Sequence, residues 1–339
     1  MISLATAIII ALTATAVIIK PVMRFFYKVG IVSLDLHKQN KPRLPSSGGS
    51  IVILGVLSGL LVYIGVQTFI YQNLSLSLYL LAAISSILIV TFSGLFDDLN
   101  VKSKPNLTKD GRNIKVGFPQ LIKPLLVLPA AIPLMVINVG ETTMSIPFVG
   151  DVNFGILYPL MVVPIGVVGA SNMVNMLGGF NGVEAGMGFI YTLGLGLYAL
   201  THGNESAALL FLCTAAALLP FLKYNWYPAK ILPGDSLTYL LGVIVAVGVI
   251  IGNMEKIGII VMTPFIIQGI LKFYSKFRLG EFVSDLGILQ KDGTIRSKYN
   301  KIYSLTHLVM RLGNFRENQI TLILISTQVI FTIIPFMIY

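Results

Sequence analysis

Long apolar runs alternate with short polar segments along nearly the whole chain. The runs lie at about 2–19, 49–71, 77–96, 119–138, 155–171, 183–201, 206–222, 236–251, 256–271 and 319–338. A helix of about 20 apolar residues is long enough to cross the hydrocarbon core of a bilayer. The pattern therefore predicts an all-α, polytopic integral membrane protein with about ten transmembrane helices.

The composition supports this interpretation. Of the 339 residues, 55% are hydrophobic and only 11% are charged, which lies far outside the range of soluble globular domains. Ten spans with their loops would use the entire chain, so we expect one transmembrane domain over residues 1–339 and not two soluble domains. The single cysteine, Cys213, can form no intrachain disulfide.

The first apolar run differs from a cleavable signal peptide in its charge order. A signal peptide carries basic residues before its apolar region, whereas here Lys20, Arg24 and Lys28 follow the run 2–19. Since basic residues favour the cytoplasmic side, we expect a retained helix whose N-terminus lies outside.

Basic residues predict the orientation of the remaining helices as well. The expected cytoplasmic loops are about 20–48, 97–118, 172–183, 223–235 and 272–318. Together with Lys123 they hold 23 of the 24 basic residues, and only Lys256 falls on the other face. This distribution predicts an integral protein of the cell (plasma) membrane with both termini outside. It also explains the net charge of +10 without a nucleic-acid partner.

The polar residues of greatest interest fall in the predicted cytoplasmic loops. The second loop opens with the acidic pair Asp97 and Asp98, and the fourth ends at Asp235, where a new helix begins. The third loop reads "SNMVNMLGGFNGVEAG" over 171–186 and contains Asn172, Asn175, Gly179, Asn181 and Glu184. All five loops can converge on one cleft at the membrane surface.

Each of these residues also has a purely structural explanation. Asp235 could be only a helix N-cap, a role that aspartate fills routinely. Asp97 and Asp98 could form a solvated helix end, although acids at a helix C-terminus oppose the macrodipole. Lys123 could extend to the bilayer interface, and the asparagines at 172 and 175 could bond across helices.

Taken together, however, the residues support a common chemistry. Carboxylate and amide oxygens suit Mg²⁺, which keeps room for phosphate oxygens and water. Glycine-rich loops allow backbone N–H groups to approach a phosphate or a base, and lysine and arginine would neutralise a diphosphate. The combination indicates phosphoryl transfer at a membrane surface.

Three motifs in this order resemble the polyprenyl-phosphate N-acetylhexosamine-1-phosphate transferases of the glycosyltransferase family 4 type. "GLFDDL" resembles the aspartate-pair motif of that family, "NMVNMLGGFNGVEAG" its asparagine and nucleotide-binding loop, and "PAKILPGDS" its third acidic motif. Gly178 and Asn181 stand where bacterial members tend to have acids, and "LVMRLGNFRENQIT" replaces a histidine-rich cluster. Both departures are similar to the eukaryotic and archaeal branch.

The resemblance implies a reaction. It is the transfer of N-acetylglucosamine 1-phosphate, or a related N-acetylhexosamine 1-phosphate, from a UDP-sugar to a polyprenyl or dolichyl phosphate in the bilayer. The reaction releases UMP, leaves a lipid diphosphate sugar and, in that branch, opens N-glycan assembly. Mg²⁺, or Mn²⁺ as an alternative, is the implied cofactor, and the choice between monomer and homodimer stays open.

The resemblance also implies roles for individual residues. The catalytic residues are Asp97, Asp98 and Lys123, and the metal ligands are Asn175 and Asp235. The substrate-binding residues are Lys41, Asn172, Gly179, Asn181, Glu184, Lys276 and Arg278, with Gly179 and Asn181 near the uracil. Leu232 stands where relatives can place an aromatic ring against uracil, and Ser46 where some have glutamate.

Two other classes compete with this interpretation. A multi-pass transporter of a sugar nucleotide or lipid-linked sugar would place charges near the bilayer midplane, whereas the acids here cluster at one face. A CDP-alcohol phosphotransferase would carry a D-G-x-x-A-R signature, which the sequence lacks. Outside the predicted site, the segment 141–155 has short β-prone pieces and predicts a small outer hairpin.

Overall fold

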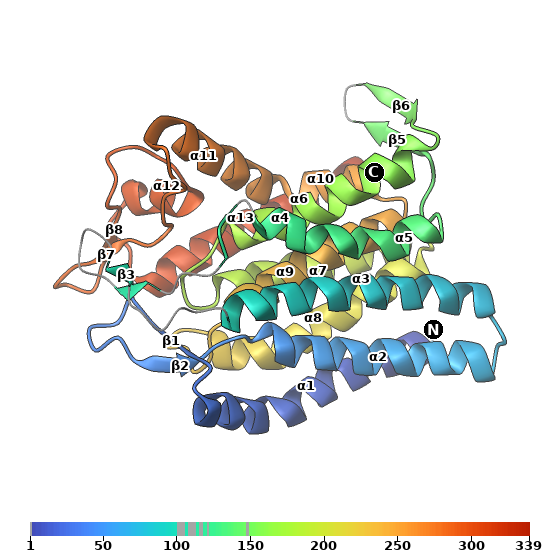
Figure 1. Ribbon diagram of the computed structural model, residues 1–339, viewed down its shortest axis with the longest axis horizontal. Coiled ribbons are helices and arrows are strands. Elements are labelled where there is room, and N and C mark those ends of the chain that lie inside the picture. The colour runs from blue at the N-terminus through green and yellow to red at the C-terminus, as the bar shows by residue number, and fades with distance from the viewer. Residues whose placement is uncertain (1, 100–105, 108–112, 115–117, 121, 147–148) are drawn as a thin grey trace.

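The computed structural model describes residues 2–99, 106–107, 113–114, 118–120, 122–146 and 149–339. Most of them are helical, and the long helices run side by side in one bundle (Figure 1). Parts of the predicted loop 97–118, at 100–105, 108–112 and 115–117, lie outside the described residues.

The order of elements follows the apolar pattern. The α-helices are α1 (Ile2–Val29), α2 (Gly49–Phe69), α3 (Leu74–Leu99), α4 (Ile122–Val127), α5 (Ile132–Val136), α6 (Val163–Asn175), α7 (Val183–Thr201), α8 (Glu205–Asn225), α9 (Gly234–Ile251), α10 (Glu255–Val261), α11 (Thr263–Leu279), α12 (Leu305–Leu312) and α13 (Glu317–Ile338). A 3₁₀ turn, η1 (Leu128–Ala131), joins α4 to α5, and a π-helical turn, η2 (Tyr158–Val162), leads into α6.

The strands form four separate two-stranded antiparallel sheets. They pair β1 (Val32–Leu34) with β2 (Arg43–Pro45), β3 (Asn106–Leu107) with β4 (Asn113–Ile114), β5 (Thr143–Ile146) with β6 (Gly150–Asn153), and β7 (Ile288–Leu289) with β8 (Ile295–Arg296). The hairpin predicted within 141–155 is confirmed as β5–β6.

Among the described residues, eight helices are long and apolar enough to cross a membrane, and the bent pair α10–α11 makes a ninth if it counts as one span. The chain is thus a mostly helical, polytopic membrane protein. The fourth predicted span, 119–138, forms only the shorter apolar helix Ile122–Val136. Pro124, Pro129 and Pro133 divide it into α4, η1 and α5, because proline removes a backbone donor and clashes with the preceding turn.

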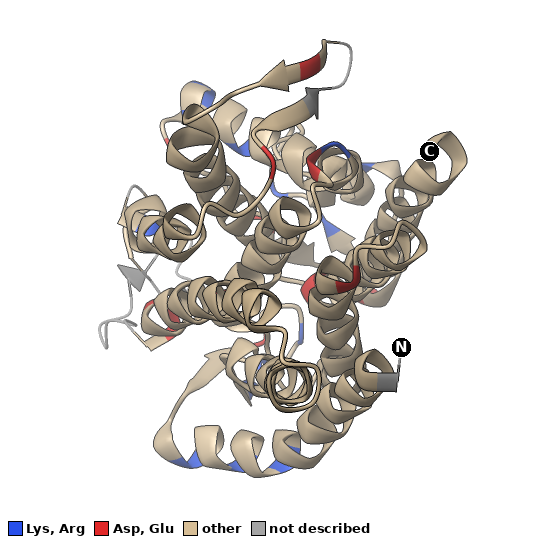
Figure 2. Cartoon of the chain, turned by 90° about the vertical axis from the view of Figure 1, so that its right-hand side faces the viewer, with Lys and Arg blue, Asp and Glu red and all other residues tan. Residues whose placement is uncertain are grey.

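Helix α9 is the centre of the bundle. Within its most apolar window 83% of the residues are buried, against 28% for α1 and 33% for α13. Its neighbours include α3, α6 and α8, so nearly every face of α9 meets another helix. Figure 2 looks along the bundle and shows helices that are almost wholly free of charged residues.

The two ends of the bundle differ in character. Both chain termini lie at the end that carries the β5–β6 hairpin (Figure 1). At the opposite end lie β1, β2, β7, β8 and α12, and the C-terminal end of α3 and the N-terminal end of α9 face the same way. Segments from distant parts of the sequence therefore meet at one end, and this end holds the candidate site.

The packing of α3 on α9 leaves no space for side chains at the point of closest approach. A Cβ built on Gly94 would lie 2.6 Å from the backbone oxygen of Asp235. On Gly65 of α2, in contrast, a Cβ would meet nothing within 4 Å. The two glycines give a matched pair of helix positions.

We expect Gly94→Ala to lower the stability of the purified protein by about 1–3 kcal/mol, because overpacking must separate two backbones. Gly65→Ala should leave stability unchanged or raise it by up to about 1 kcal/mol, since alanine has the higher helix propensity. Thermal unfolding in detergent measures both. Equal unfolding temperatures for the two variants would contradict the close approach.

Candidate active site

The acidic pair at the end of α3 divides into two different roles. Asp98 points to the start of α9, where its Oδ1 accepts the backbone N–H of Asp235 at 2.7 Å and its Oδ2 that of Ser236 at 3.2 Å. The first N–H groups of a helix have no partner within the helix, and Pro233 at the cap position of α9 offers no side-chain bond. Asp98 thus caps α9 from another helix, and Asp235 itself is not the cap.

Glycine at position 234 makes this contact sterically feasible. Gly234 has φ +69°, a left-handed conformation that glycine adopts without strain. A Cβ on it would lie 2.4 Å from the Oδ2 of Asp98. The "PGDS" sequence is therefore a turn that admits an aspartate from a second helix.

Asp97 and Asp235 share a single ammonium group. The Nζ of Lys123 lies 2.5 Å from the Oδ2 of Asp97 and 2.6 Å from the Oδ2 of Asp235. The Asp97 side chain is 2% exposed and that of Asp235 31%. Asp97 also accepts the backbone N–H of Phe118 at 2.5 Å. Two carboxylates from α3 and α9 are thereby held around one cation, with Asp235 the more accessible.

Asn175, at the end of α6, completes this cluster. Its Nδ2 approaches the Oδ2 of Asp235 at 3.4 Å, and its Oδ1 accepts the hydroxyl of Thr238 at 2.7 Å. Thr238, one turn along α9 from Asp235, is a residue that sequence reasoning missed. Its only sequence signal is the helical spacing from Asp235.

Two adjoining cavities, of about 580 and 420 Å³, open around the cluster. Their shared wall consists of Gln120, Lys123, Gly179, Glu184, Pro233, Gly234, Asp235 and Leu286. The larger cavity extends to Leu36, Asn181 and Leu232, and the smaller to Asn172, Asn175 and Asp285. Lys123 and Asp235 therefore stand at the junction of one two-lobed cleft.

The structure brings together most of the predicted site residues. Those that line the cleft are Asp97, Asp98, Lys123, Asn172, Asn175, Gly179, Asn181, Glu184 and Asp235. Ser46 and Leu232 line it as well. Within this set, Asn172 donates to the carbonyl of Val168 one helical turn before it, at 2.8 Å.

Three predicted residues are not brought to the cleft. Lys41 lines a separate cavity of about 240 Å³. Lys276 donates to the carbonyl of Gly280 at 2.7 Å, and Arg278 lies beside Tyr274. Two of the three belong to the end of α11, which projects from the bundle, so their charge acts on the cleft only from a distance.

The glycine-rich loop between α6 and α7 is held by an acid. The buried Glu184 accepts the backbone N–H of Gly179 on Oε1 at 2.8 Å. A Cβ on Gly178 would lie 2.2 Å from that oxygen. Glu184 therefore holds the loop that lines the cleft, and it uses one carboxylate oxygen, Oε1, to do so.

Asn181 joins four parts of the chain. Its Oδ1 accepts Lys38 Nζ at 3.0 Å and the backbone N–H of Ala229 at 3.0 Å, while its own N–H donates to the Oε1 of Glu317 at 2.8 Å. Lys38 also forms ion pairs with Glu317 and, at 3.3 Å, with Asp35. Sequence reasoning missed Lys38, Glu317 and Asp35.

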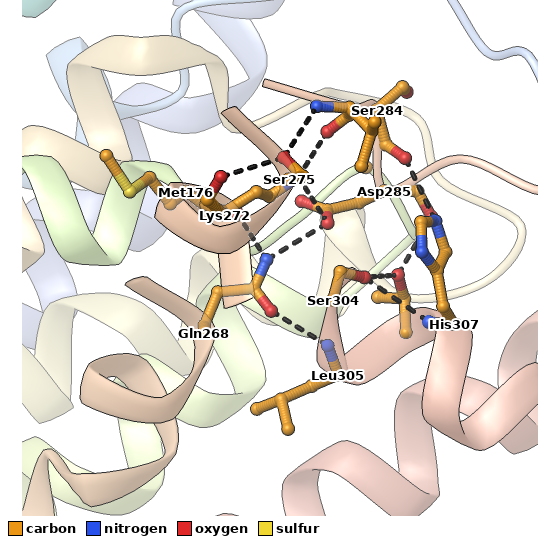
Figure 3. A network of polar contacts seen from close by, with 12 residues as sticks. Met176, Gln268, Lys272, Ser275, Ser284, Asp285, Ser304, Leu305 and His307 are labelled. Atoms are coloured by element: carbon orange, nitrogen blue, oxygen red, sulfur yellow. Dashed lines mark hydrogen bonds and ion pairs between the residues drawn. The ribbon is translucent and has the colours of Figure 1, made fainter. Parts of the chain in front are cut away.

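A second polar network supports the other lobe of the cleft (Figure 3). The buried Gln268 of α11 donates to the carbonyl of Met176 at 2.6 Å and to the Oδ1 of Asp285 at 3.0 Å. Lys272, one turn later, pairs with Asp285 at 2.7 Å. The network joins α11 and the segment around Asp285 to the residue after Asn175, and its members were also missed.

His307 lies at the edge of this network (Figure 3). Its Nε2 donates to the carbonyl of Ser284 at 3.0 Å, since a carbonyl can only accept. Its Nδ1 is buried and has no hydrogen-bond partner among the described residues. Burial lowers the pKa of this imidazole below its usual value of about 6.5.

The donor set at the junction suits a hard divalent cation. The carboxylates of Asp97 and Asp235 and the amide oxygen of Asn175 are the oxygen ligands that Mg²⁺ prefers, and Mg²⁺ takes only one or two carboxylates beside phosphate oxygens. The ammonium of Lys123 already lies between the two carboxylates. In the part of the chain that the structure describes, no three His, Cys, Asp or Glu side chains converge as a metal centre.

A comparison with protein-family models finds one match in the core of the bundle. Residues 79–253, which run from α3 to the start of the loop after α9, match glycosyl transferase family 4. The chain belongs to glycosyl transferase family 4. This match confirms the family that the three motifs resemble. The matched range of this family 4 protein includes Asp97, Lys123, Asn175 and Asp235.

Full-length relatives extend the similarity beyond that range. The chain is 34% identical to a protein of Saccharolobus solfataricus, over 92% of this chain and 89% of that one, and 33% identical to a protein of Sulfolobus acidocaldarius, over 97% and 94%. Both are provisionally assigned as UDP-N-acetylglucosamine–dolichyl-phosphate N-acetylglucosaminephosphotransferases. The Schizosaccharomyces pombe enzyme of that name is 27% identical, over 80% and 67%.

The two aspartates should respond differently to the same substitution. Asp98→Asn removes one acceptor from the cap of α9 and should cost about 1–2 kcal/mol of stability. Asp97→Asn leaves that cap intact and should lower turnover on the order of a hundredfold with little change in unfolding temperature, because it alters the group beside Lys123. Thermal unfolding and turnover of both variants separate the roles, and indistinguishable behaviour would contradict the division.

The buried imidazole predicts a pH dependence of stability. Because the folded pKa of His307 is lowered, protonation favours the unfolded chain, so stability is present above pH 6.5 and is lost as the pH falls toward the folded pKa. His307→Gln keeps a donor for the carbonyl of Ser284 and should flatten this dependence. Thermal unfolding from pH 8 to pH 5 measures it, and parallel curves for wild type and variant would exclude His307 as the cause.

Proposed function

We propose that this family 4 enzyme transfers N-acetylglucosamine 1-phosphate from UDP-N-acetylglucosamine to dolichyl phosphate or a related polyprenyl phosphate. The observation that carries the proposal is the junction of the two cavities, where Lys123, Asp97, Asp235 and Asn175 meet at the membrane-helix ends. Relatives over nearly the whole chain bear the name of this activity.

The shape of the cleft supports an arrangement for the nucleotide sugar. The larger lobe, with Asn181 and Leu232, would hold the nucleoside, and the smaller, with Asn172, would hold the sugar. The diphosphate would then lie at the junction, beside the ammonium of Lys123. A buried ammonium next to phosphate oxygens offsets charge that water cannot reach.

The reaction forms one P–O bond and breaks another. An oxygen of the lipid phosphate attacks the sugar-linked phosphorus of the nucleotide sugar, the bond from that phosphorus to the bridging oxygen breaks, and UMP leaves with the electron pair. The attacking phosphate is mostly dianionic at neutral pH because its second pKa is about 6. Asp97 would orient this phosphate through Lys123, and no strong base is required.

Asn175 and Asp235 would hold Mg²⁺, or Mn²⁺, which would supply positive charge where the leaving UMP becomes more negative. The protein contributes position, because Asp98 fixes the first turn of α9. The carboxamide of Asn175, whose oxygen accepts the Thr238 hydroxyl and whose Nδ2 faces Asp235, would turn its oxygen toward the ion. Lys123 would exchange a carboxylate contact for a phosphate oxygen when substrate binds. Orientation and charge neutralisation account for most of the catalysis in such transfers.

The location of the cleft fits an acceptor whose tail stays in the bilayer. The cleft opens at the ends of membrane-length helices, where a long isoprenoid can remain in lipid while its phosphate reaches Lys123. We assign this end to the cytoplasmic side of the cell membrane, because the basic segments 20–48 and 272–318 lie there and basic residues favour that side.

The test is a product analysis with the purified enzyme. Radiolabelled UDP-N-acetylglucosamine, dolichyl phosphate and Mg²⁺ should yield a butanol-soluble labelled lipid and an equal amount of UMP. Asp235→Asn should abolish most of both products while thermal unfolding stays close to wild type, because the cap of α9 is supplied by Asp98. Uptake of label into vesicles without lipid labelling would overturn the proposal in favour of a transporter.

A further inference from the structure

The starting observation is the fixed orientation of the Asn181 carboxamide. Its oxygen receives two hydrogen bonds, from the ammonium of Lys38 and from the backbone N–H of Ala229, each at 3.0 Å. Both groups are obligate donors, since an ammonium and an amide N–H have no acceptor capacity. The oxygen and nitrogen of this carboxamide cannot be exchanged without placing donor against donor.

Lys38 is itself held in place on several sides. It forms ion pairs with Glu317 and Asp35, and its Nζ lies 4.3 Å from the centre of the Tyr227 ring. Glu317 also accepts the backbone N–H of Asn181 at 2.8 Å, and Thr321 donates to the Asn181 carbonyl at 3.0 Å. All four residues that hydrogen-bond to Asn181 lie outside its loop, so the orientation is imposed by the tertiary structure.

The remaining polar atom of Asn181 is its Nδ2, which has no hydrogen-bond partner among the described residues. Asn181 lines the larger cavity, whereas Lys38 and Ala229 do not. The oxygen is therefore turned toward groups behind the cavity wall, and the Nδ2 is left as the atom that a ligand can reach. Where Asn181 lines the larger lobe, its side chain therefore offers a ligand a hydrogen-bond donor and not an acceptor.

We infer that Lys38 is a positioning residue. It fixes the Asn181 carboxamide so that the nucleoside lobe selects a base with a carbonyl at position 4 over a base with an amino group there. The inference rests on the proposed function. Uracil presents an acceptor at this position and cytosine a donor. Against cytosine the Nδ2 of Asn181 would face another donor, with both groups cut off from water.

The experiment measures binding of UMP and CMP to the detergent-purified full chain by isothermal titration, without turnover. For wild type we expect CMP to bind about ten- to a hundredfold more weakly than UMP, the cost of one mismatched buried hydrogen bond. Lys38→Met releases the carboxamide, which can then turn, so the ratio of the two dissociation constants should fall to within about threefold of one. The ratio is independent of the fraction of folded protein.

Two further variants sharpen the test. Asn181→Asp replaces the donor by an acceptor and should reverse the preference, so that CMP binds more tightly than UMP. Lys230→Met removes an exposed lysine next to Ala229 and should leave the ratio as in wild type, which separates the orientation effect from a general loss of positive charge.

The outcomes distinguish the two levels of the proposal. A wild-type protein that binds UMP and CMP equally, or a Lys38→Met variant with the full wild-type ratio, would overturn the inference while the transferase function stands. A wild-type protein that binds neither nucleotide would overturn both. A collapsed ratio in Lys38→Met together with an unchanged ratio in Lys230→Met supports the inference.

Discussion

The ion pairs of Lys123 with Asp97 and Asp235 are the interaction on which the site depends. They join three elements, α3, α4 and α9, at distances of 2.5 and 2.6 Å. Loss of Lys123 would leave two carboxylates together without a cation, which is costly away from water, whereas loss of one carboxylate leaves a neutral ion pair. The same arrangement leaves one negative charge in excess, which the Mg²⁺ of the proposed reaction would offset.

This cluster needs α9 to begin at one defined position. Asp98 secures that position by accepting the backbone N–H groups of Asp235 and Ser236, which lie 137 and 138 positions away in the sequence. The close approach at Gly94 brings the two helices together. The acidic pair therefore combines structure and chemistry in adjacent residues. Asp98 accepts backbone N–H groups of α9. Asp97 pairs with the ammonium of Lys123, which also pairs with Asp235 of α9.

Much of the fold was predictable because apolar length is a strong signal. Most of the long apolar runs form membrane-length helices. The prediction of a full span at 119–138 was wrong because Pro124, Pro129 and Pro133 divide the helix, and a count of apolar residues does not detect this effect. The site was predictable where residues sit at helix ends in recognisable motifs, as Asp97, Asn175 and Asp235 do. It was not predictable for Lys38, Gln268 or Asp285, whose partners are distant in sequence and whose segments carry no pattern.

The same limit explains why the role of Asp98 and the orientation of Asn181 emerge only from the structure. A motif indicates which residue types are present, but a carboxylate beside a helix start can cap it or face a substrate, and a carboxamide can present either its oxygen or its nitrogen. Which one occurs depends on donors supplied by other loops, here the N–H of Ala229 and the ammonium of Lys38. In this cleft, two segments that are distant in the sequence decide which polar atom of Asn181 faces the cavity.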